Sequence, residues 1–598
     1  MVNKTTGNIT VNNQLRWKVI DGLQLVGQAV IRKYDMDENV TNKKITNYDW
    51  DNNEVREKRT PNSAERRYQK TLSKNFTLYA DYKKNFNDRH DLSVMVGTSH
   101  ESENYDRFTA KRINFDQQEN MSLQLGSAQD QNAWSEGNQW TINSFFSRVN
   151  YTFANKYVIE GTIRADGSSR FDPDHRWGWF PGVNAAWRVG EEGFMKRLGW
   201  FEDLKVRASY GEMGNQSGIG LYDYIQLISL SNDYYPFGAG VKGQMATSGN
   251  IISTSRTWET IQTTNVGFDF STLNNRLYGS FDYFWKENKN MLIPKTYPSM
   301  LGADAPSTNS GHLSIHGWEI SLGWRDQIKD FSYSVRFNIS DAKNKVVDRV
   351  GSNLIKLGNN ETPTGYPLNS YFGYEFDGII QNEQELEAYK SRFSEGGIPG
   401  DLSVGDAMYK DLDGDGKLSV LGDGKEGSGD VKYLGDKNPR YNFGFNLSMA
   451  WKGFDLSAFI QGVGRRTMFL EGESRCPMPE AWYQSAEYWY GKTWTPERTD
   501  AQYPAITLKD KRNYNYYVST NTKFNVAYAR LKNLQFGYTI PQTLTSKAGL
   551  QKVRVYFSGE DLFEVHNTPN GWDPEENSGS ITSYPFTRNY SFGINVVF

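Results

Sequence analysis

The stretch Asp411-Leu-Asp-Gly-Asp-Gly416 carries three carboxylates at alternate positions. Carboxylate oxygens at this spacing can converge on a hard divalent cation such as Ca²⁺, and the glycines permit the sharp turn that this requires. An EF-hand loop would place a glutamate at its twelfth position, which is Gly422 here. We therefore predict a structural Ca²⁺ site that is not an EF-hand, with the candidate ligands Asp411, Asp413, Asp415 and Asp423. The alternative is an acidic turn that binds no ion.

A second group of candidate residues is aromatic and lies in the same half of the chain. Flat rings with polar edges suit the faces of sugars and also contacts with other proteins. The substrate-contact candidates are Trp482, Tyr483, Trp489, Trp494, Tyr514 and Tyr516. The alternative is that these rings form the small cores of their own loops, or an aromatic girdle at a membrane interface.

Residues that would indicate catalysis are scarce. The six histidines are scattered, and His312 and His316, if they lie on a strand, would be about 13 Å apart and could not share one ion. The single cysteine, Cys476, excludes an internal disulfide and any metal site built on paired cysteines. The sequence therefore predicts a protein that is not an enzyme and that requires no cofactor beyond the possible Ca²⁺.

Alternating residues indicate which elements position these groups. In the last ten residues, Tyr590, Phe592 and Ile594 share one face with Val596 and Phe598, while small and polar residues fill the other face. This period of two predicts a β-strand. A membrane β-barrel uses such a strand directly, with one face toward lipid and the other toward a wet lumen. A soluble β-sandwich could also contain it.

Similar strands recur along the whole chain, and short turns alternate with long loops. The short turns include Asp21-Gly22, Asn87-Asp88, Ala154-Asn155, Asn274-Asn275 and Lys452-Gly453, which are typical of β-hairpins. The long loops include residues 215–255, 346–440 and 465–523. About seventeen strands are expected, and this asymmetry of turns and loops is typical of outer-membrane barrels. A β-propeller would instead show short strands and an internal repeat, and we find no repeat.

Composition agrees with a barrel and excludes several other classes. Of 598 residues, 14% are aromatic, the formal net charge is −3 and the mean hydropathy is −0.70. This charge gives no basis for nucleic-acid binding. No apolar run reaches the length of a membrane-spanning helix. The low hydropathy remains compatible with a barrel, in which only every second residue faces lipid.

The direction of the strands gives one further expectation. Suppose that both barrel termini lie in the periplasm, so that the last strand runs toward the periplasm. Counting back through the short turns then makes the first strand of this chain run toward the periplasm too. A barrel that begins in the periplasm must start with a strand in the opposite direction, so an odd number of strands is expected to precede this chain. No secretory signal follows Met1. We therefore expect the chain to be the carboxyl-terminal part of a barrel. Residues 371–380 also resemble a strand, but the same count of strand directions leaves no membrane crossing for them. We therefore assign them to the loop over residues 346–440.

Several motifs together resemble the SusC/RagA family of TonB-linked outer-membrane transporters. They are Arg164-Ala-Asp-Gly-Ser-Ser-Arg-Phe171, Arg176-Trp-Gly-Trp-Phe-Pro181, Leu204-Lys-Val-Arg-Ala-Ser-Tyr-Gly211, Tyr409-Lys-Asp-Leu-Asp-Gly-Asp-Gly416, Ala529-Arg-Leu-Lys-Asn-Leu534, Ser558-Gly-Glu-Asp-Leu-Phe563 and Asp573-Pro-Glu575. They cover nearly the whole chain.

The resemblance implies an all-β fold, an antiparallel transmembrane barrel of twenty-two strands with an internal plug. Residues 1–598 would then form about seventeen of these strands, with the signal peptide, the plug and the first strands outside the chain, and residues 346–440 would form a large extracellular loop with the aspartate-rich motif. The location implied is the outer membrane of a Gram-negative, Bacteroidetes-like bacterium.

The implied function is TonB-dependent uptake of glycan or peptide oligomers. The implied partners are a SusD-like surface lipoprotein, the TonB complex through the missing amino-terminal part, the lipid bilayer and the oligosaccharide or peptide itself. The alternative is a secreted all-β protein that binds carbohydrate or mediates adhesion without transport.

Alternation along the strands places Phe268, Ile320, Leu447, Phe592 and Ile594 on the lipid face of the barrel and Asn446 in the lumen.

Overall fold

The computed structural model describes residues 1–598 except 232–235, 238–240, 243–244, 250, 295–299, 301–305, 350–357, 359–362, 421–428, 480–484, 508–510, 577–578, 580–583 and 585. Contacts between Cα atoms divide the chain into two units. Unit 1 comprises Met1–Ala185, Ser209–Gln262 and Pro294–Asn309, and unit 2 comprises Ala186–Ala208, Thr263–Ile293 and Ser310–Phe598.

Seventeen of the described strands belong to one antiparallel sheet, the number that the sequence predicts. The first ten are β1 (Val2–Ile20), β2 (Leu23–Asn42), β5 (Ser63–Phe86), β6 (His90–Ile113), β7 (Gln131–Phe153), β8 (Tyr157–Ser168), β9 (Trp177–Arg188), β10 (Asp203–Asn215), β15 (Glu259–Thr272) and β16 (Leu277–Pro294). The others are β17 (Ser307–Ile328), β18 (Phe331–Asp348), β23 (Arg440–Trp451), β24 (Phe454–Arg465), β27 (Tyr528–Ile540), β28 (Lys552–His566) and β29 (Asn589–Val597).

Each strand pairs with strands that neighbour it in the chain. In unit 1, β1 pairs with β2, β2 with β5, β5 with β6, β6 with β7, and β7 with β8. In unit 2, β17 pairs with β18, and the pairing continues through β23, β24, β27 and β28 to β29. Such a meander keeps all pairing local along the chain, as in an up-and-down barrel.

Tight turns join the strands where the sequence predicts them. Asn87, Asp88, Ala154 and Asn155 all have φ between 52° and 58°. Positive φ at both central residues defines the type I′ turn, whose twist matches that of paired strands. At the first turn, Gly22 has φ 86° and a Cβ there would lie 2.3 Å from the Lys83 carbonyl oxygen, so glycine is required.

Several strands are longer than the pattern of alternation predicts. The clearest case is the connection between β2 and β5, which is shortened because β2 continues to Asn42 and β5 begins at Ser63. The ladder between β1 and β2 is regular out to Val2 opposite Val40. Beyond Tyr34, polar residues such as Glu38 interrupt the apolar face of β2, and the backbone hydrogen bonds continue although the hydrophobic alternation is broken.

Smaller elements lie outside the large sheet. Unit 1 contains the pairs β3 (Ile45–Tyr48) with β4 (Glu54–Lys58), β11 (Ile228–Ser231) with β14 (Met245–Ser248), and β12 (Pro236–Phe237) with β13 (Val241–Lys242). Unit 2 contains α1 (Gly193–Leu198), α2 (Glu383–Lys390), α3 (Lys511–Asn515) and α4 (Gln542–Thr545). It also contains the pairs β19 (Ser370–Tyr374) with β22 (Val431–Asp436), β20 (Phe376–Ile379) with β21 (Ala407–Tyr409), and β25 (Thr467–Met468) with β26 (Phe524–Asn525). No described helix is both long and apolar enough to cross a membrane.

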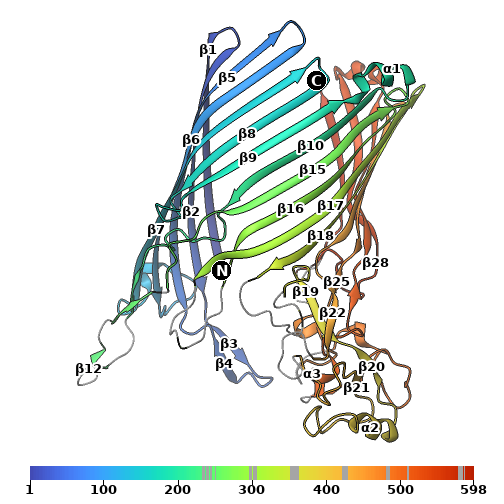
Figure 1. Ribbon diagram of the computed structural model, residues 1–598. Helices are drawn as coiled ribbons and strands as arrows, with labels where there is room; N and C mark the ends of the chain where they lie inside the picture. The colour runs from blue at the N-terminus through green and yellow to red at the C-terminus, as the bar shows by residue number, and fades with distance from the viewer. Residues whose placement is uncertain are drawn as a thin grey trace. The chain divides into compact units, whose positions relative to one another are not determined.

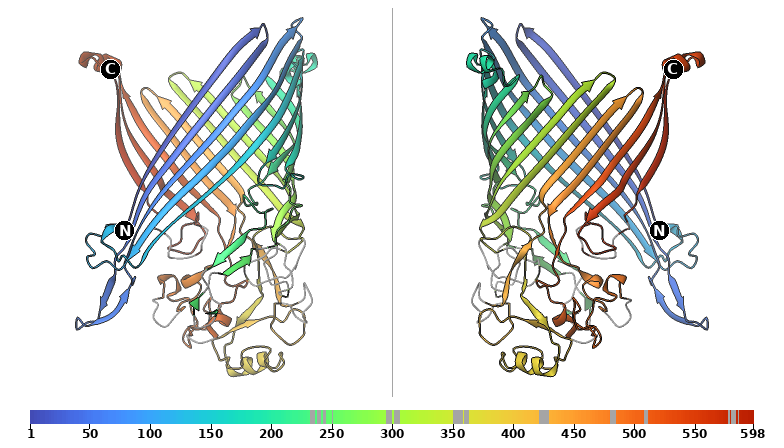
Figure 2. Two further views of the ribbon diagram at one scale, coloured as in Figure 1. Left: turned by 90° about the vertical axis from the view of Figure 1, so that its left-hand side faces the viewer. Right: turned by 90° about the vertical axis from the view of Figure 1, so that its right-hand side faces the viewer.

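The segment 371–380 is confirmed as lying outside the large sheet, since β19 and β20 each pair in a separate two-stranded sheet. Within unit 2, these small sheets and α2 gather beyond one end of the long strands, and the C terminus lies at the other end (Figure 1). The side views show the same arrangement, with the helix α2 far from the carboxyl end of β29 (Figure 2). Unit 2 therefore places its folded loops at one strand end and its short turns at the other.

Candidate functional site

Two long loops of unit 2 fold together into what we call the loop module, the described residues of 363–439 and 466–527. The first loop connects β18 to β23, and the second connects β24 to β27. They meet through backbone hydrogen bonds, including Tyr374 N–H to the Val518 carbonyl oxygen at 3.0 Å and Ala505 N–H to the Gly405 carbonyl oxygen at 2.8 Å. The loops are therefore a structured unit rather than two independent surface segments.

Three buried tyrosines hold the two loops together. The Tyr389 hydroxyl lies 2.8 Å from the Tyr514 hydroxyl, and it accepts a hydrogen bond from Tyr409 N–H at 2.9 Å. The Tyr409 hydroxyl donates to the Tyr514 carbonyl oxygen at 2.8 Å. Each ring is at most 2% exposed. Because every hydroxyl has a partner, the module buries three polar groups without leaving them unsatisfied.

A second aromatic core lies in the same module. Trp489, Tyr503 and Tyr516 pack in edge-to-face pairs, with ring centroids 4.9 Å and 5.6 Å from that of Trp489. The Tyr516 hydroxyl donates to the Pro504 carbonyl oxygen at 3.0 Å. Cys476 is buried in this cluster. Edge-to-face pairs of this kind stabilise a core beyond the area that they bury.

Three of the aromatic substrate candidates are buried in these two cores. Trp489, Tyr514 and Tyr516 are 3%, 2% and 1% exposed, so in this structure they offer no ring face to a ligand. For these three residues the structure favours the alternative interpretation, that the rings form the core of their own loops. Trp494 is half-buried, and its indole N–H donates to Gln381 Oε1 at 3.0 Å. Trp482 and Tyr483 lie outside the described residues.

The aspartate-rich motif forms part of a carboxylate group in the loop module. Asp411, Asp413 and Asp430 each offer an oxygen within 4.8 Å of those of the other two. Asp415 is not in this group, and its Oδ1 accepts from Lys417 N–H at 2.7 Å. Asp423 lies outside the described residues. The structure thus brings together two of the four predicted ligands and adds a third carboxylate.

Asp430 was missed by the sequence analysis and is the most buried member of the group. It is fully buried and accepts from Leu412 N–H at 2.6 Å and Ser419 N–H at 2.8 Å. Burial raises the pKa of the Asp430 carboxyl, and the charges of Asp413 and Asp411 act in the same direction. A divalent cation would relieve this repulsion, and the three oxygens fit the donor set that Ca²⁺ prefers. No spacing rule connects Asp430 to the motif, so the sequence carried no signal for it.

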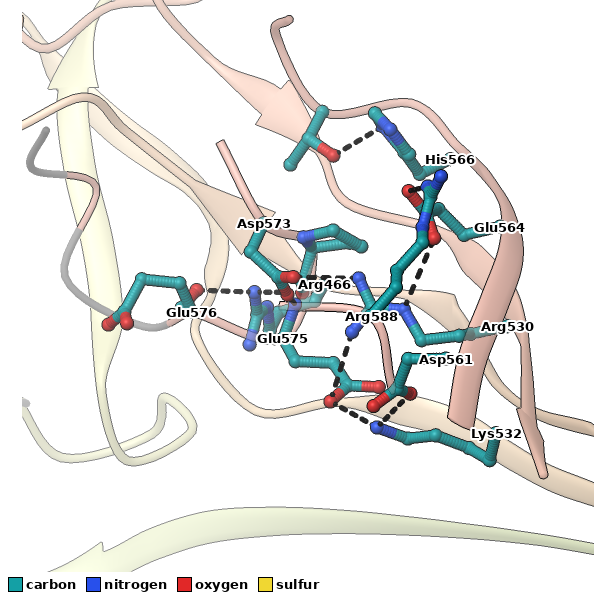
Figure 3. Close-up of polar contacts among 12 residues, drawn as sticks. Arg466, Arg530, Lys532, Asp561, Glu564, His566, Asp573, Glu575, Glu576 and Arg588 are labelled. Atoms are coloured by element: carbon teal, nitrogen blue, oxygen red, sulfur yellow. Dashed lines mark hydrogen bonds and ion pairs between the residues drawn. The ribbon is translucent and has the colours of Figure 1, made fainter. Parts of the chain in front are cut away.

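A buried arginine organises a second cluster, at the end of β27 and β28. Arg530 is 1% exposed and directs its guanidinium toward three carboxylates. Arg530 Nη2 lies 2.7 Å from Asp573 Oδ2, and Nη1 lies 3.3 Å from Glu575 Oε2 (Figure 3). The third carboxylate, Glu564, pairs directly opposite Arg530 in the sheet and bonds Arg588 at 2.6 Å. The ring of Phe586 covers the guanidinium at 4.1 Å.

A β-bulge between β27 and β28 adds the ion pair of Lys532 and Asp561 to this cluster. The register shifts between Leu531 and Asn533, and Asp561 on the partner strand has φ 54°. Lys532 then bridges Asp561 at 3.0 Å and Glu575 at 2.8 Å (Figure 3). The loop after β28 is therefore fastened to the strand wall through Asp573 and Glu575. β-bulges commonly redirect a side chain in this way.

Long antiparallel strands with alternating faces and large folded loops at one strand end define an outer-membrane β-barrel protein. The protein-family model described as "TonB dependent receptor-like, beta-barrel" matches residues 3–562 of this chain. The chain belongs to this TonB-dependent receptor family, and its location is the outer membrane. Because the family consists of receptors, this membership also supports a protein that is not an enzyme.

Curated relatives agree with this assignment. The chain is 31% identical over 558 residues to TonB-dependent receptor P3 of Formosa agariphila, a match that spans 88% of this chain and 52% of the relative. It is 26% identical over 568 residues to TonB-dependent receptor SusC of Bacteroides thetaiotaomicron, spanning 88% of this chain and 50% of SusC. The chain therefore spans about half the length of the curated relatives that it matches.

Among solved structures, the RagAB peptide transporter has the same fold. The TM-score is 0.81 at 22% identity, and the match covers all of this chain and 62% of that chain. Together these findings confirm the resemblance to the SusC/RagA family and the all-β barrel fold. They do not favour the alternative of a secreted carbohydrate-binding or adhesion protein.

Proposed function

We propose that this chain forms the wall and outer loops of a nutrient importer of the SusC type. Its substrates would be oligomers of sugar or amino acids, and TonB would supply the energy. The observation that carries this proposal is the loop module, in which the two loops that flank the β23–β24 hairpin share buried cores and make a folded platform at one strand end. A platform of this kind suits the capture of an extended oligomer better than a mobile loop does.

The proposed partner is a SusD-like surface lipoprotein. The similar solved structure is that of the RagAB peptide transporter. Among the described residues, the loop module also exposes the ring of Tyr490, at 90% exposure. Exposed aromatic residues are enriched where proteins meet. We therefore assign the outer surface of the loop module to the contact with the lipoprotein.

We also propose that Ca²⁺ binds Asp411, Asp413 and Asp430 and stabilises the loop module without taking part in chemistry. Asp415 and Asp423 remain possible further ligands in the proposal, because a Ca²⁺ ion takes six to eight oxygens. For substrate contact, Trp482, Tyr483 and Trp494 remain proposed, whereas Trp489, Tyr514 and Tyr516 act through the shape of the module that their burial maintains.

Uptake in the native host tests the proposal. Cells lacking this gene should lose import of fluorescently labelled oligosaccharides or peptides while still importing the corresponding monomers, and a strain lacking TonB should show the same loss. Affinity purification of the protein from outer membranes should recover a surface lipoprotein. Unchanged import of both oligosaccharides and peptides in the deletion strain would contradict the proposal.

A further inference from the structure

A cationic cavity lies in unit 2, and neither the carboxylate group nor Arg530 is among the residues that line it. Its volume is about 370 Å³, within the range of small-ligand sites. Five cationic side chains line it, together with His316 and a single carboxylate, Asp436. The cationic residues are Lys343, Lys345, Arg440, Arg465 and Arg466.

The elements of the fold explain why these cations converge. Lys343 pairs directly opposite His316 across β17 and β18, and Arg440 pairs directly opposite Arg465 across β23 and β24. Like charges directly opposite each other in a sheet are destabilising. The sheet therefore brings two guanidinium groups together at this site, and Asp341 pairs with that of Arg440.

Most of this positive charge is not neutralised within the protein. In the part of the chain that the structure describes, Lys343, Lys345 and Arg465 form no ion pair with a carboxylate. Arg440 is paired with Asp341, and Arg466 donates to the carbonyl oxygens of Pro574 at 2.7 Å and Glu576 at 2.9 Å. These residues leave a surplus of positive charge in the cavity.

The carboxylate in the lining does not offset this surplus by direct pairing. Asp436 Oδ2 accepts from the Tyr433 hydroxyl at 2.8 Å, and Oδ1 accepts from Asn438 N–H at 3.0 Å. Its oxygens are thus held by neutral donors. The positive charge of Arg465 also acts on Lys523. Burial lowers the pKa of the Lys523 ammonium, and repulsion from Arg465 and Lys432 lowers this pKa further.

The remaining lining is suited to a hydroxylated ligand. Asn344, Asn438, Thr467 and the ring of Tyr433 provide amide, hydroxyl and aromatic surface between the cations. Separated cations with such groups match a sugar that carries acidic substituents, because each carboxylate, sulfate or phosphate can take a charge-assisted hydrogen bond while the ring packs on the tyrosine. A compact acidic peptide would use the cations but not this polar and aromatic surface.

We propose that this cavity binds an anionic saccharide unit through Lys343, Lys345 and Arg465. The unit could belong to a free acidic oligosaccharide or to the phosphorylated sugar headgroup of an outer-leaflet glycolipid, which share this chemistry. The proposal concerns binding alone and holds whether or not the protein imports the sugar.

Calorimetric titration of the purified full-length protein in detergent tests the assignment. The probes are trigalacturonate, neutral galactotriose, triglutamate and lipopolysaccharide. The test variant is Lys343→Gln/Lys345→Gln/Arg465→Gln. A matched control, Lys329→Gln/Lys547→Gln/Lys552→Gln, removes three exposed cations elsewhere in unit 2. Circular dichroism and a melting temperature within a few degrees of wild type show that each variant is folded.

The wild-type protein and the control should bind trigalacturonate or lipopolysaccharide, with an affinity that falls as salt rises, and the test variant should bind at least tenfold more weakly. Trigalacturonate binding identifies a free oligosaccharide as the ligand, and binding of lipopolysaccharide alone identifies a glycolipid headgroup. Three results would overturn the proposal: no binding of either probe, equal binding by the test variant, or binding of triglutamate in preference to both.

Discussion

Replacing Arg530 with methionine should loosen the loop after β28 and destabilise the protein. Methionine keeps much of the side-chain volume but removes the charge that faces Asp573, Glu575 and Glu564. The guanidinium is 1% exposed, so water cannot replace it readily. Breaking a buried ion pair by removing one partner costs about 3–5 kcal/mol, because it leaves charge without compensation.

We expect the lower end of this range for Arg530→Met. Glu575 keeps Lys532, and Glu564 keeps Arg588, so two of the three carboxylates retain a cation. Asp573 loses the ion pair with Arg530, although it still accepts from Glu575 N–H at 2.7 Å. The largest effect should therefore appear at Asp573 and its neighbours.

Two measurements on the purified protein in detergent test this expectation. Guanidinium-induced unfolding should show a free energy of unfolding lower by about 3 kcal/mol. Hydrogen exchange should become faster at residues 567–576, while β23 stays protected. Arg530→Lys should fall between wild type and Arg530→Met, since it keeps the charge but not the planar fork. Lys547→Met, at an exposed position, is the control.

The double variant Arg530→Met/Asp573→Asn separates charge from packing. If the uncompensated carboxylate causes the loss, neutralising Asp573 should restore a measurable part of the stability. Wild-type stability and unchanged exchange over residues 567–576 in Arg530→Met would refute the role assigned to this cluster.

Further predictions concern the loop module and the strand wall. Ca²⁺ should raise the melting temperature of the wild type and of the control Asp401→Asn but not of Asp430→Asn, and an equal rise in all three proteins would remove Asp430 from the site. Because the pKa of Asp430 is raised by burial, protons should compete with Ca²⁺ as the pH falls through that pKa, so titration at pH 5 should show weaker Ca²⁺ binding than at pH 7. Without Ca²⁺, the stability of the module should fall as the pH rises through the pKa of Asp430, because the charged carboxylate of Asp430 opposes folding. Tyr514→Ala should lower the stability by about 3–5 kcal/mol whereas Tyr490→Ala, at an exposed ring, should change it by less than about 0.5 kcal/mol, and equal losses would contradict the burial of Tyr514. Leu447→Arg should cost about 2–4 kcal/mol and Asn446→Arg much less, as judged by unfolding in lipid vesicles.

The architecture of the wall could be predicted from sequence because its rules are local. Alternation sets the faces of a strand, and residues such as Asn87 and Asp88 set the turns, so the number of strands and most turns were correct. Strand length was underestimated where polar residues interrupt the apolar face, as at the end of β2. Hydrogen bonding continues there, but the side chains no longer report which face is buried.

The site was harder to predict because its contacts join distant segments. Tyr389, Tyr409 and Tyr514 appear as unrelated aromatic residues in sequence, and only the folded loops reveal them as one core. Asp430 likewise joins Asp411 and Asp413 from outside the motif. Long-range contacts of this kind follow no fixed spacing, so a single sequence carries no period that would reveal them.

The motifs that carried the resemblance have a physical basis in the structure. Arg530 and Lys532 come from one motif, Asp561 from a second, and Asp573 and Glu575 from a third, and all five meet in the cluster of Figure 3. They were recognised separately because they are more than ten residues apart in sequence. Together they make one fastening between the strand wall and the last loop.

Site-directed spin labelling along β23 tests most directly whether this wall spans a membrane. In a Cys476→Ala background, single labels at Asn446, Leu447, Ser448 and Met449 would be compared in lipid vesicles. The labels at Leu447 and Met449 should collide with oxygen, which concentrates in lipid, and those at Asn446 and Ser448 with a water-soluble nickel chelate. Equal accessibility at all four positions would contradict a wall with one face toward lipid and the other toward water.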